Sequence, residues 1–206
     1  MAAELKPLIL AGGRSTRMGS PKHLLTCPDG TPLYQRQIRL LRNACPNATT
    51  IYISLAKDSE KDPYLRGADR HKLQIIYDLD ANETDQSLGP AQGLLSAHQH
   101  DLTATWLVLA VDYPLVSTDM LRQLQDAYQP PVTCFRNADG YCEPLIGIWS
   151  PEALRRLDQN IRHGHGSGPS AIVKHIGTQI GPTGQGDMVL MNVNTESDWQ
   201  QALLQM

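Results

Sequence analysis

The chain has 206 residues, a length that favours one domain covering residues 1–206. Its charges nearly balance, with 18 Lys and Arg against 21 Asp and Glu and a formal net charge of −3. A nucleic-acid-binding protein normally carries a basic patch, and a membrane-surface protein carries a polybasic run, so the composition indicates neither partner. No stretch stays apolar for about 18 residues and the N-terminus lacks a signal-peptide pattern, so we expect a cytoplasmic protein.

Apolar runs typical of buried strands alternate along the chain with segments of helical periodicity. The predicted strands cover residues 7–11, 49–54, 72–77, 106–111 and 188–193. The predicted helices begin near Thr31, Gly89, Ser117, Ser150 and Thr195, at residue types that favour helix starts. This alternation predicts an α/β fold, in which helices cover both faces of an open, mostly parallel, Rossmann-like sheet in three α/β/α layers.

Residues 130–148 fit this alternation poorly. Asn137–Gly140 reads as a hairpin turn between two apolar runs. We interpret the segment as a small hairpin insertion, and two roles stay open for it: a wall of a substrate site, or an edge ribbon of the sheet.

The segment 10–22, with the sequence LAGGRSTRMGSPK, directly follows the first predicted strand. Gly12 and Gly13 let the backbone approach an anion closely, and Arg17 and Lys22 add positive charge. Ligands of open α/β sheets bind beyond the carboxyl ends of the strands, which is where this segment lies. It matches neither the Walker A loop nor the GxGxxG fingerprint. It therefore predicts a phosphate-binding loop of another kind, with a flexible turn carrying surface cations as the alternative.

An aspartate ends the most apolar predicted strand, in the sequence VDYP. At that position the Asp112 carboxylate can hold Mg²⁺ and thereby bridge to phosphates, although an aspartate that caps the turn before Pro114 is the alternative. Further polar or glycine positions lie at predicted strand ends or at a helix start: Asp78, Gly89, and the pair Asn192 and Asn194 on one face of the last predicted strand.

The motifs LAGGRSTRMGSPK, Asp78, GPAQG, VDYP and NVNT, in this order, resemble those of the molybdenum cofactor nucleotidyltransferases, above all the guanylyltransferases. The opening Leu10-Ala11-Gly12-Gly13 favours guanine, because the cytidylyltransferase branch usually opens with Ala-Ala-Gly. The resemblance implies a nucleotide-diphospho-sugar transferase-like fold and Mg²⁺-dependent transfer of GMP from GTP to the phosphate of molybdopterin, with release of pyrophosphate. It also implies transient contact with proteins that supply or receive the molybdenum cofactor.

Three sets of site residues follow from the motifs and the resemblance together. The catalytic residues are Arg17, Lys22 and Asp112, and Asp112 is also the metal ligand. The nucleotide-binding residues are Leu10, Ala11, Gly12, Gly13, Lys22, Ser54, Asp78, Gly89 and Asp112. Ser54 stands where the guanylyltransferases typically carry Asn. The acceptor-binding residues are Glu143, Asn192 and Asn194.

Two other functions remain open. One is a cytidylyltransferase acting on the same acceptor, or another nucleotidyltransferase acting on a small-molecule phosphate. The other is a non-catalytic carrier that binds a nucleotide or the pterin. Pyrophosphate release separates the enzymes from the carrier, and nucleotide preference separates the enzymes from one another.

Overall fold

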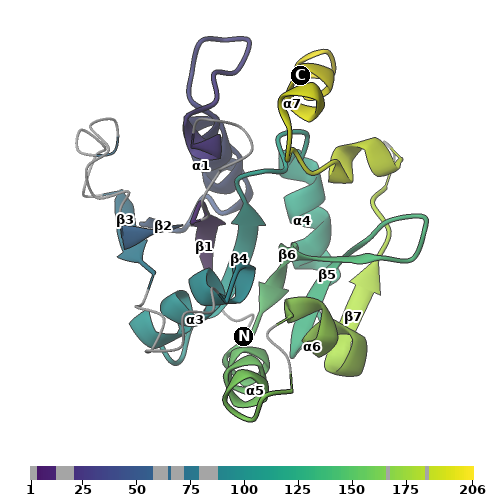
Figure 1. Cartoon of the computed structure of the whole chain (residues 1–206). Coiled ribbons are helices and arrows are strands. Elements are labelled where there is room, and N and C mark those ends of the chain that lie inside the picture. Colours follow the sequence, from purple (N-terminus) through teal and green to yellow (C-terminus); the bar gives the residue numbers. More distant parts are fainter. Residues whose placement is uncertain are drawn as a thin grey trace.

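The computed structural model describes residues 4–12, 21–57, 65, 72–78, 88–165, 168–183 and 186–206. Within these ranges the strands form one seven-stranded sheet in the order β3-β2-β1-β4-β6-β5-β7, shown in Figure 1. Strand β6 runs antiparallel to both of its neighbours, and the other paired strands are parallel. The strands are β1 (Leu5–Leu10), β2 (Ile51–Leu55), β3 (Leu73–Tyr77), β4 (Thr105–Ala110), β5 (Val132–Arg136), β6 (Cys142–Trp149) and β7 (Gly177–Ile180).

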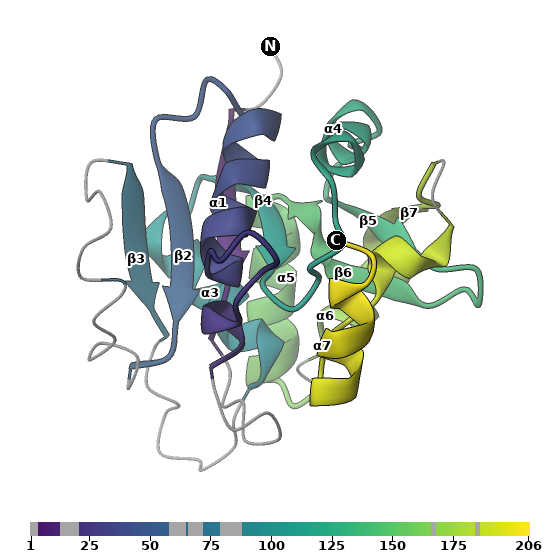
Figure 2. The same cartoon turned by 90° about the horizontal axis from the view of Figure 1, so that it is seen from above.

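Helices cover both faces of this sheet. Helices α1 and α4 pack together on one face, and α3, α5 and α6 pack in a row on the other (Figures 1 and 2). The α-helices are α1 (Leu33–Ala44), α3 (Pro90–His100), α4 (Thr118–Asp126), α5 (Pro151–Arg162), α6 (Pro169–Ile176) and α7 (Glu196–Leu203). The three-layer α/β/α architecture predicted from the sequence is therefore confirmed.

The hydrophobic core lies on both faces of the central strands. Every residue of β2 and β4 is buried, and Trp106 and Trp149 have no exposed surface. Strands covered on both faces read as continuous apolar runs, which explains why β1, β2 and β4 correspond to predicted strands. Strand β3, at the edge of the sheet, is only partly buried but also corresponds to a predicted strand. In the described ranges, no helix has both the length and the apolar character needed to cross a membrane.

Three of the six described α-helices, α4, α5 and α7, begin at side-chain caps, as predicted. The hydroxyls of Ser117 and Ser150 accept hydrogen bonds from the backbone N–H groups three residues later, and Thr195 forms a complete capping box with Asp198. Helix α1 begins slightly later than predicted, with Pro32 as its N-cap residue.

The strand predicted at residues 188–193 is wrong. These residues begin in a 3₁₀ turn, Asp187–Leu190, and continue as irregular chain. Val189, Leu190 and Val193 are buried nonetheless. A short apolar run in the sequence indicates that the segment is buried, but it does not distinguish a strand from a packed loop.

The predicted hairpin insertion is part of the main sheet. Strand β6 lies between β4 and β5, and β5 pairs in turn with β7, which the sequence analysis did not predict. The hairpin is therefore neither a separate wall nor an edge ribbon. The second strand of the hairpin, β6, pairs with the central strand β4, and Trp106 lies opposite Trp149.

Lys6 and Asp101 form an ion pair beside β4, at the end of the sheet where that strand begins. Lys6 Nζ also lies 5.7 Å from the centre of the Tyr52 ring, and Asp101 accepts hydrogen bonds from the backbone and hydroxyl of Thr103 at 2.9 and 2.8 Å. The hydrogen bond from Lys6, with those from Thr103, holds the pKa of Asp101 well below its usual range. A depressed pKa stabilises the folded chain above the unfolded pKa of about 3.9, and this contribution is lost as the pH falls below it.

We therefore expect Asp101→Asn to lower the free energy of unfolding by about 1 kcal/mol at pH 7, because the pair is partly exposed and screened. The loss should shrink as the pH falls below about 4, where the wild-type protein loses the same contribution. Urea unfolding of the wild-type and Asp101→Asn proteins at pH 7 and pH 3 measures the loss of unfolding free energy at each pH. Asp119→Asn, at an 89% exposed side chain, is the control. An equal loss for Asp101→Asn at both pH values would contradict this role of the carboxylate.

Candidate active site

The candidate site lies at the carboxyl ends of β1, β2, β3 and β4, which meet at one edge of the sheet. Hydrogen bonds continue the pairing beyond the strands: Ala11 N–H donates to the Ser54 carbonyl at 2.9 Å, and Val111 N–H donates to the Leu10 carbonyl at 2.9 Å. The chain that follows β1 is thus held against its neighbours on both sides. This edge contains Gly12 and Asp78 on one side and Asp112 on the other.

Gly12, Ser54 and Asp78 form one contact group at this edge. The Ser54 hydroxyl donates to Asp78 Oδ1 at 2.7 Å. A Cβ atom at Gly12 would lie 2.4 Å from Asp78 Oδ2, so the carboxylate can occupy this position only beside a glycine. Burial raises the pKa of Asp78, and the hydrogen bond from Ser54 opposes that rise. The predicted nucleotide-binding residues at these three strand ends are therefore in mutual contact.

Helix α3 begins next to this group. Gly89, its N-cap residue, has a positive φ of 55°, which favours glycine. Gly93 allows the first turn of the helix to lie close to the strands, because a Cβ there would be 2.9 Å from Leu10 Cδ2 and 3.0 Å from Ser54 Oγ. The GPAQG motif therefore places a helix N-terminus beside Leu10 and Ser54. Such a terminus offers N–H groups to an anion.

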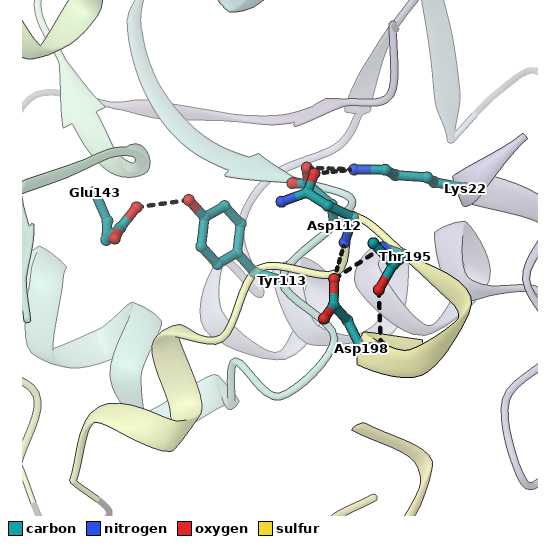
Figure 3. Close-up of polar contacts among 7 residues, drawn as sticks. Lys22, Asp112, Tyr113, Glu143, Thr195 and Asp198 are labelled. Atoms are coloured by element: carbon teal, nitrogen blue, oxygen red, sulfur yellow. Dashed lines mark hydrogen bonds and ion pairs between the residues drawn. The ribbon is translucent and has the colours of Figure 1, made fainter. Parts of the chain in front are cut away.

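Lys22, Asp112 and Asn194 form the second contact group, and Figure 3 labels Lys22 and Asp112. Lys22 Nζ donates to Asp112 Oδ2 at 3.1 Å and to Asn194 Oδ1 at 2.9 Å. Asp112 lies 90 positions after Lys22 along the chain, and Asn194 lies 172 positions after it. The structure thus brings the end of the glycine-rich segment to the aspartate that follows β4, as the sequence analysis expected.

The α7 capping box fixes the position of Asn194. The Asp198 carboxylate accepts hydrogen bonds from the N–H groups of Asn194 and Thr195 at 2.9 and 2.8 Å (Figure 3). One step earlier, Val193 N–H donates to the Asp112 carbonyl at 2.9 Å. The NVNT segment is therefore held between the N-terminus of α7 and the loop that carries Asp112.

Asp112 keeps one oxygen for a ligand. Its Oδ2 atom accepts from Lys22, whereas Oδ1 is buried and has no hydrogen-bond partner among the described residues. An unpartnered buried carboxylate oxygen fits a hard divalent cation, which prefers oxygen ligands. No three His, Cys, Asp or Glu side chains in the described part of the chain gather into a metal site. A cation at Asp112 would therefore take its other ligands from amide, phosphate or water oxygens.

Tyr113 is a site residue that the sequence analysis missed. Its hydroxyl donates to Glu143 Oε2 at 2.6 Å (Figure 3), and the Asn192 side chain hydrogen-bonds to the same hydroxyl group. Burial raises the pKa of Glu143, and the nearby charge of Asp112 adds to this rise. Glu143 and Asn192 thus lie beside Asp112, linked by a tyrosine. The available signal was the position of Tyr113 directly after Asp112.

Helix α1 supports the turn that carries Tyr113. Gln37 has no exposed surface and donates to the Tyr113 carbonyl at 3.0 Å, and Arg36 donates to the Pro114 carbonyl at 3.2 Å. A glutamine on the otherwise apolar face of α1 was the only signal of this support in the sequence. Gly13 and Arg17 lie outside the described residues, so their predicted contacts stay predictions.

The fold and these strand-end groups define a nucleotidyltransferase. Residues 7–179 match the model of the MobA-like NTP transferase domain, and the chain belongs to that family. It is 31% identical over 168 residues to the probable molybdenum cofactor guanylyltransferase of Rhodopirellula baltica, a match covering 78% of this chain and 74% of that protein. It is also 31% identical over 157 residues to the molybdenum cofactor biosynthesis bifunctional protein of Synechocystis, covering 72% of this chain and 40% of that protein.

Solved structures share the fold over nearly the whole chain. Molybdopterin-guanine dinucleotide biosynthesis protein A of Archaeoglobus fulgidus superimposes with a TM-score of 0.70 at 18% identity, and the match covers 97% of both chains. Rv0371c of Mycobacterium tuberculosis, crystallised in complex with manganese, superimposes with a TM-score of 0.63 at 20% identity over 100% of both chains. At these identities the likeness concerns the fold.

Proposed function

We propose that this nucleotidyltransferase transfers GMP from GTP to the terminal phosphate of molybdopterin, with or without bound molybdenum, and releases pyrophosphate in a Mg²⁺-dependent reaction. The observation that carries the proposal is the contact of Lys22 with both Asp112 and Asn194, beside a buried Asp112 oxygen that has no partner among the described residues. Relatives named as guanylyltransferases and the opening Leu10-Ala11-Gly12-Gly13 support guanine as the base.

An oxygen of the acceptor phosphate attacks the α-phosphorus of GTP. A new P–O bond forms, the bond between the α-phosphorus and its bridging oxygen breaks, and pyrophosphate leaves with that electron pair. No general base is required, because a phosphate monoester has a second pKa of about 6 and is largely dianionic at neutral pH. The protein's contribution is therefore to position the two phosphates and neutralise their charge.

The two contact groups at the sheet edge would have different tasks in this reaction. Asp112, with its unpartnered oxygen, would hold the Mg²⁺ ion, which supplies charge neutralisation on the phosphates when bound. Lys22 places its ammonium group beside Asp112, where phosphate oxygens would also lie. Gly12, Ser54 and Asp78 would contact the nucleoside. Arg17 would add charge on the leaving pyrophosphate, and Asn192, Asn194 and Glu143 would line the acceptor side.

Nucleotide binding and pyrophosphate release test the proposal together. GTP with Mg²⁺ at a hundred times its dissociation constant should add about 2.7 kcal/mol to the apparent stability of the protein, measured as a thermal shift. CTP, ATP and UTP at the same concentration should add less. Pyrophosphate should then appear only with both GTP and molybdopterin. A larger shift with CTP would favour the cytidylyltransferase, and binding without pyrophosphate release would favour the carrier.

Gly12→Ala is expected to weaken GTP binding about tenfold, a loss of about 1.4 kcal/mol. The added methyl group would overlap Asp78 Oδ2, so the carboxylate that accepts the Ser54 hydrogen bond would have to shift from its position beside Gly12. Titration calorimetry with GTP and Mg²⁺ measures the change. Gly168→Ala is the matched control, because its Cβ would meet no atom within 4 Å. Unchanged GTP affinity in a folded Gly12→Ala protein would exclude Gly12 and Asp78 from the nucleotide site.

A further inference from the structure

A chain of three hydrogen-bonded side chains, Glu143, Tyr113 and Asn192, lies next to Asp112. Tyr113 is only 3% exposed, and it follows Asp112 directly on the loop after β4. Its hydroxyl contacts the Glu143 carboxylate from β6 on one side and the Asn192 amide on the other.

The directions of these hydrogen bonds are fixed by the chemistry of the three groups. An ionised carboxylate only accepts, and a phenol has a single hydrogen. Because Tyr113 donates this hydrogen to Glu143 Oε2, its oxygen can only accept from Asn192. The Asn192 side chain must therefore turn its NH₂ group toward Tyr113 and its Oδ1 atom away from it.

Two oxygens near this chain are left without a donor. Asn192 Oδ1 and Asp112 Oδ1 are both buried, and neither has a hydrogen-bond partner among the described residues. Val193 N–H donates to the Asp112 carbonyl at 2.9 Å, which holds the residue after Asn192 against the Asp112 backbone. Unpaired buried acceptors are unfavourable unless a ligand supplies a donor or a cation. A divalent cation satisfies both a carboxylate and an amide oxygen.

We propose that Glu143 and Tyr113 are positioning residues: they hold the Asn192 amide with its oxygen directed at the cation that Asp112 binds. This role rests on the proposed function, since it assumes a cation at Asp112. It also gives Glu143 a role other than contact with the acceptor. Without the Tyr113 hydroxyl, the Asn192 amide is free to turn over and present its NH₂ group, which cannot bind a cation.

The test measures cation affinity directly. Mn²⁺ is titrated into the protein with saturating GTP, and free Mn²⁺ is followed by electron paramagnetic resonance. We expect Tyr113→Phe to raise the Mn²⁺ dissociation constant about tenfold, and Glu143→Leu, which removes the acceptor for the phenol hydrogen, to raise it similarly. A second substitution, Asn192→Asp, should restore the affinity of Tyr113→Phe, because both oxygens of a carboxylate accept and its orientation no longer matters.

Tyr128→Phe is the matched control. The Tyr128 hydroxyl bonds to Thr105 and Ser150, at the far end of β4 from Asp112, so its loss should leave the Mn²⁺ affinity unchanged. Unchanged affinity in folded Tyr113→Phe and Glu143→Leu proteins, or no recovery with Asn192→Asp, would overturn the positioning role. Pyrophosphate release by the wild-type protein is measured in parallel. Its absence would overturn the proposed function, whereas the Mn²⁺ series decides the positioning role independently.

Discussion

Replacing Asp112 by asparagine is expected to slow pyrophosphate release at least about a hundredfold. The substituted amide would keep the shape of the side chain but lose the charge that pairs with Lys22 and that would hold the cation through the unpartnered Oδ1 atom. Removing one preorganised electrostatic group at a reacting centre typically costs about 3 to 4 kcal/mol of transition-state stabilisation. The rate should be measured with saturating GTP and acceptor over a range of Mg²⁺ concentrations.

Asp126→Asn is the control for this substitution, because Asp126 is exposed at the end of α4. Both proteins should unfold near the wild-type midpoint, since an active-site ion pair that is partly exposed contributes little to stability. Undiminished turnover in the folded Asp112→Asn protein would remove Asp112 from the reaction. A loss of turnover with an equal loss in Asp126→Asn would point to a general effect of charge.

The fold was predictable where local sequence and final environment agree. Strands β1 and β4 are apolar runs because both faces of each are covered, and Ser117, Ser150 and Thr195 mark helix starts because capping is a local interaction. The position of β6 was not predictable in this way. Its place between β4 and β5 depends on pairing with a strand far away in the sequence, and no feature of residues 142–149 alone specifies that partner.

The site divides in the same way between residues that local sequence identifies and residues that it does not. Lys22 and Asp112 were identifiable because each comes after an apolar strand, and the rule for open α/β sheets places strand ends together. Asn194 was singled out on a predicted strand that does not form, and hydrogen bonds of the irregular segment to Asp112 and Asp198 bring it to the site instead. Tyr113 was missed because its role depends on Glu143 and Asn192, which reach it from β6 and from an irregular segment. Sequence patterns therefore located residues at the sheet edge, but not the hydrogen bonds between them.

Lys22→Met should have the second large effect. We expect it to lower the rate of pyrophosphate release about a hundredfold, because the ammonium group lies at the junction of Asp112 and Asn194, where it would stabilise negative charge on the phosphates. Methionine keeps most of the apolar stem, so packing around this partly buried side chain should change little. Lys174→Met, at an exposed position on α6, is the matched control and should retain full turnover.

The double variant Lys22→Met/Asp112→Asn separates a shared role from two independent ones. If both side chains act on one triphosphate, the second substitution should cost much less than it does in the wild-type protein, because groups in contact couple strongly. If the rate loss of the double variant equals the product of the two single rate losses, the two residues serve different steps. Full turnover of the folded Lys22→Met protein would exclude Lys22 from the reaction and leave its contact with Asp112 as a structural ion pair.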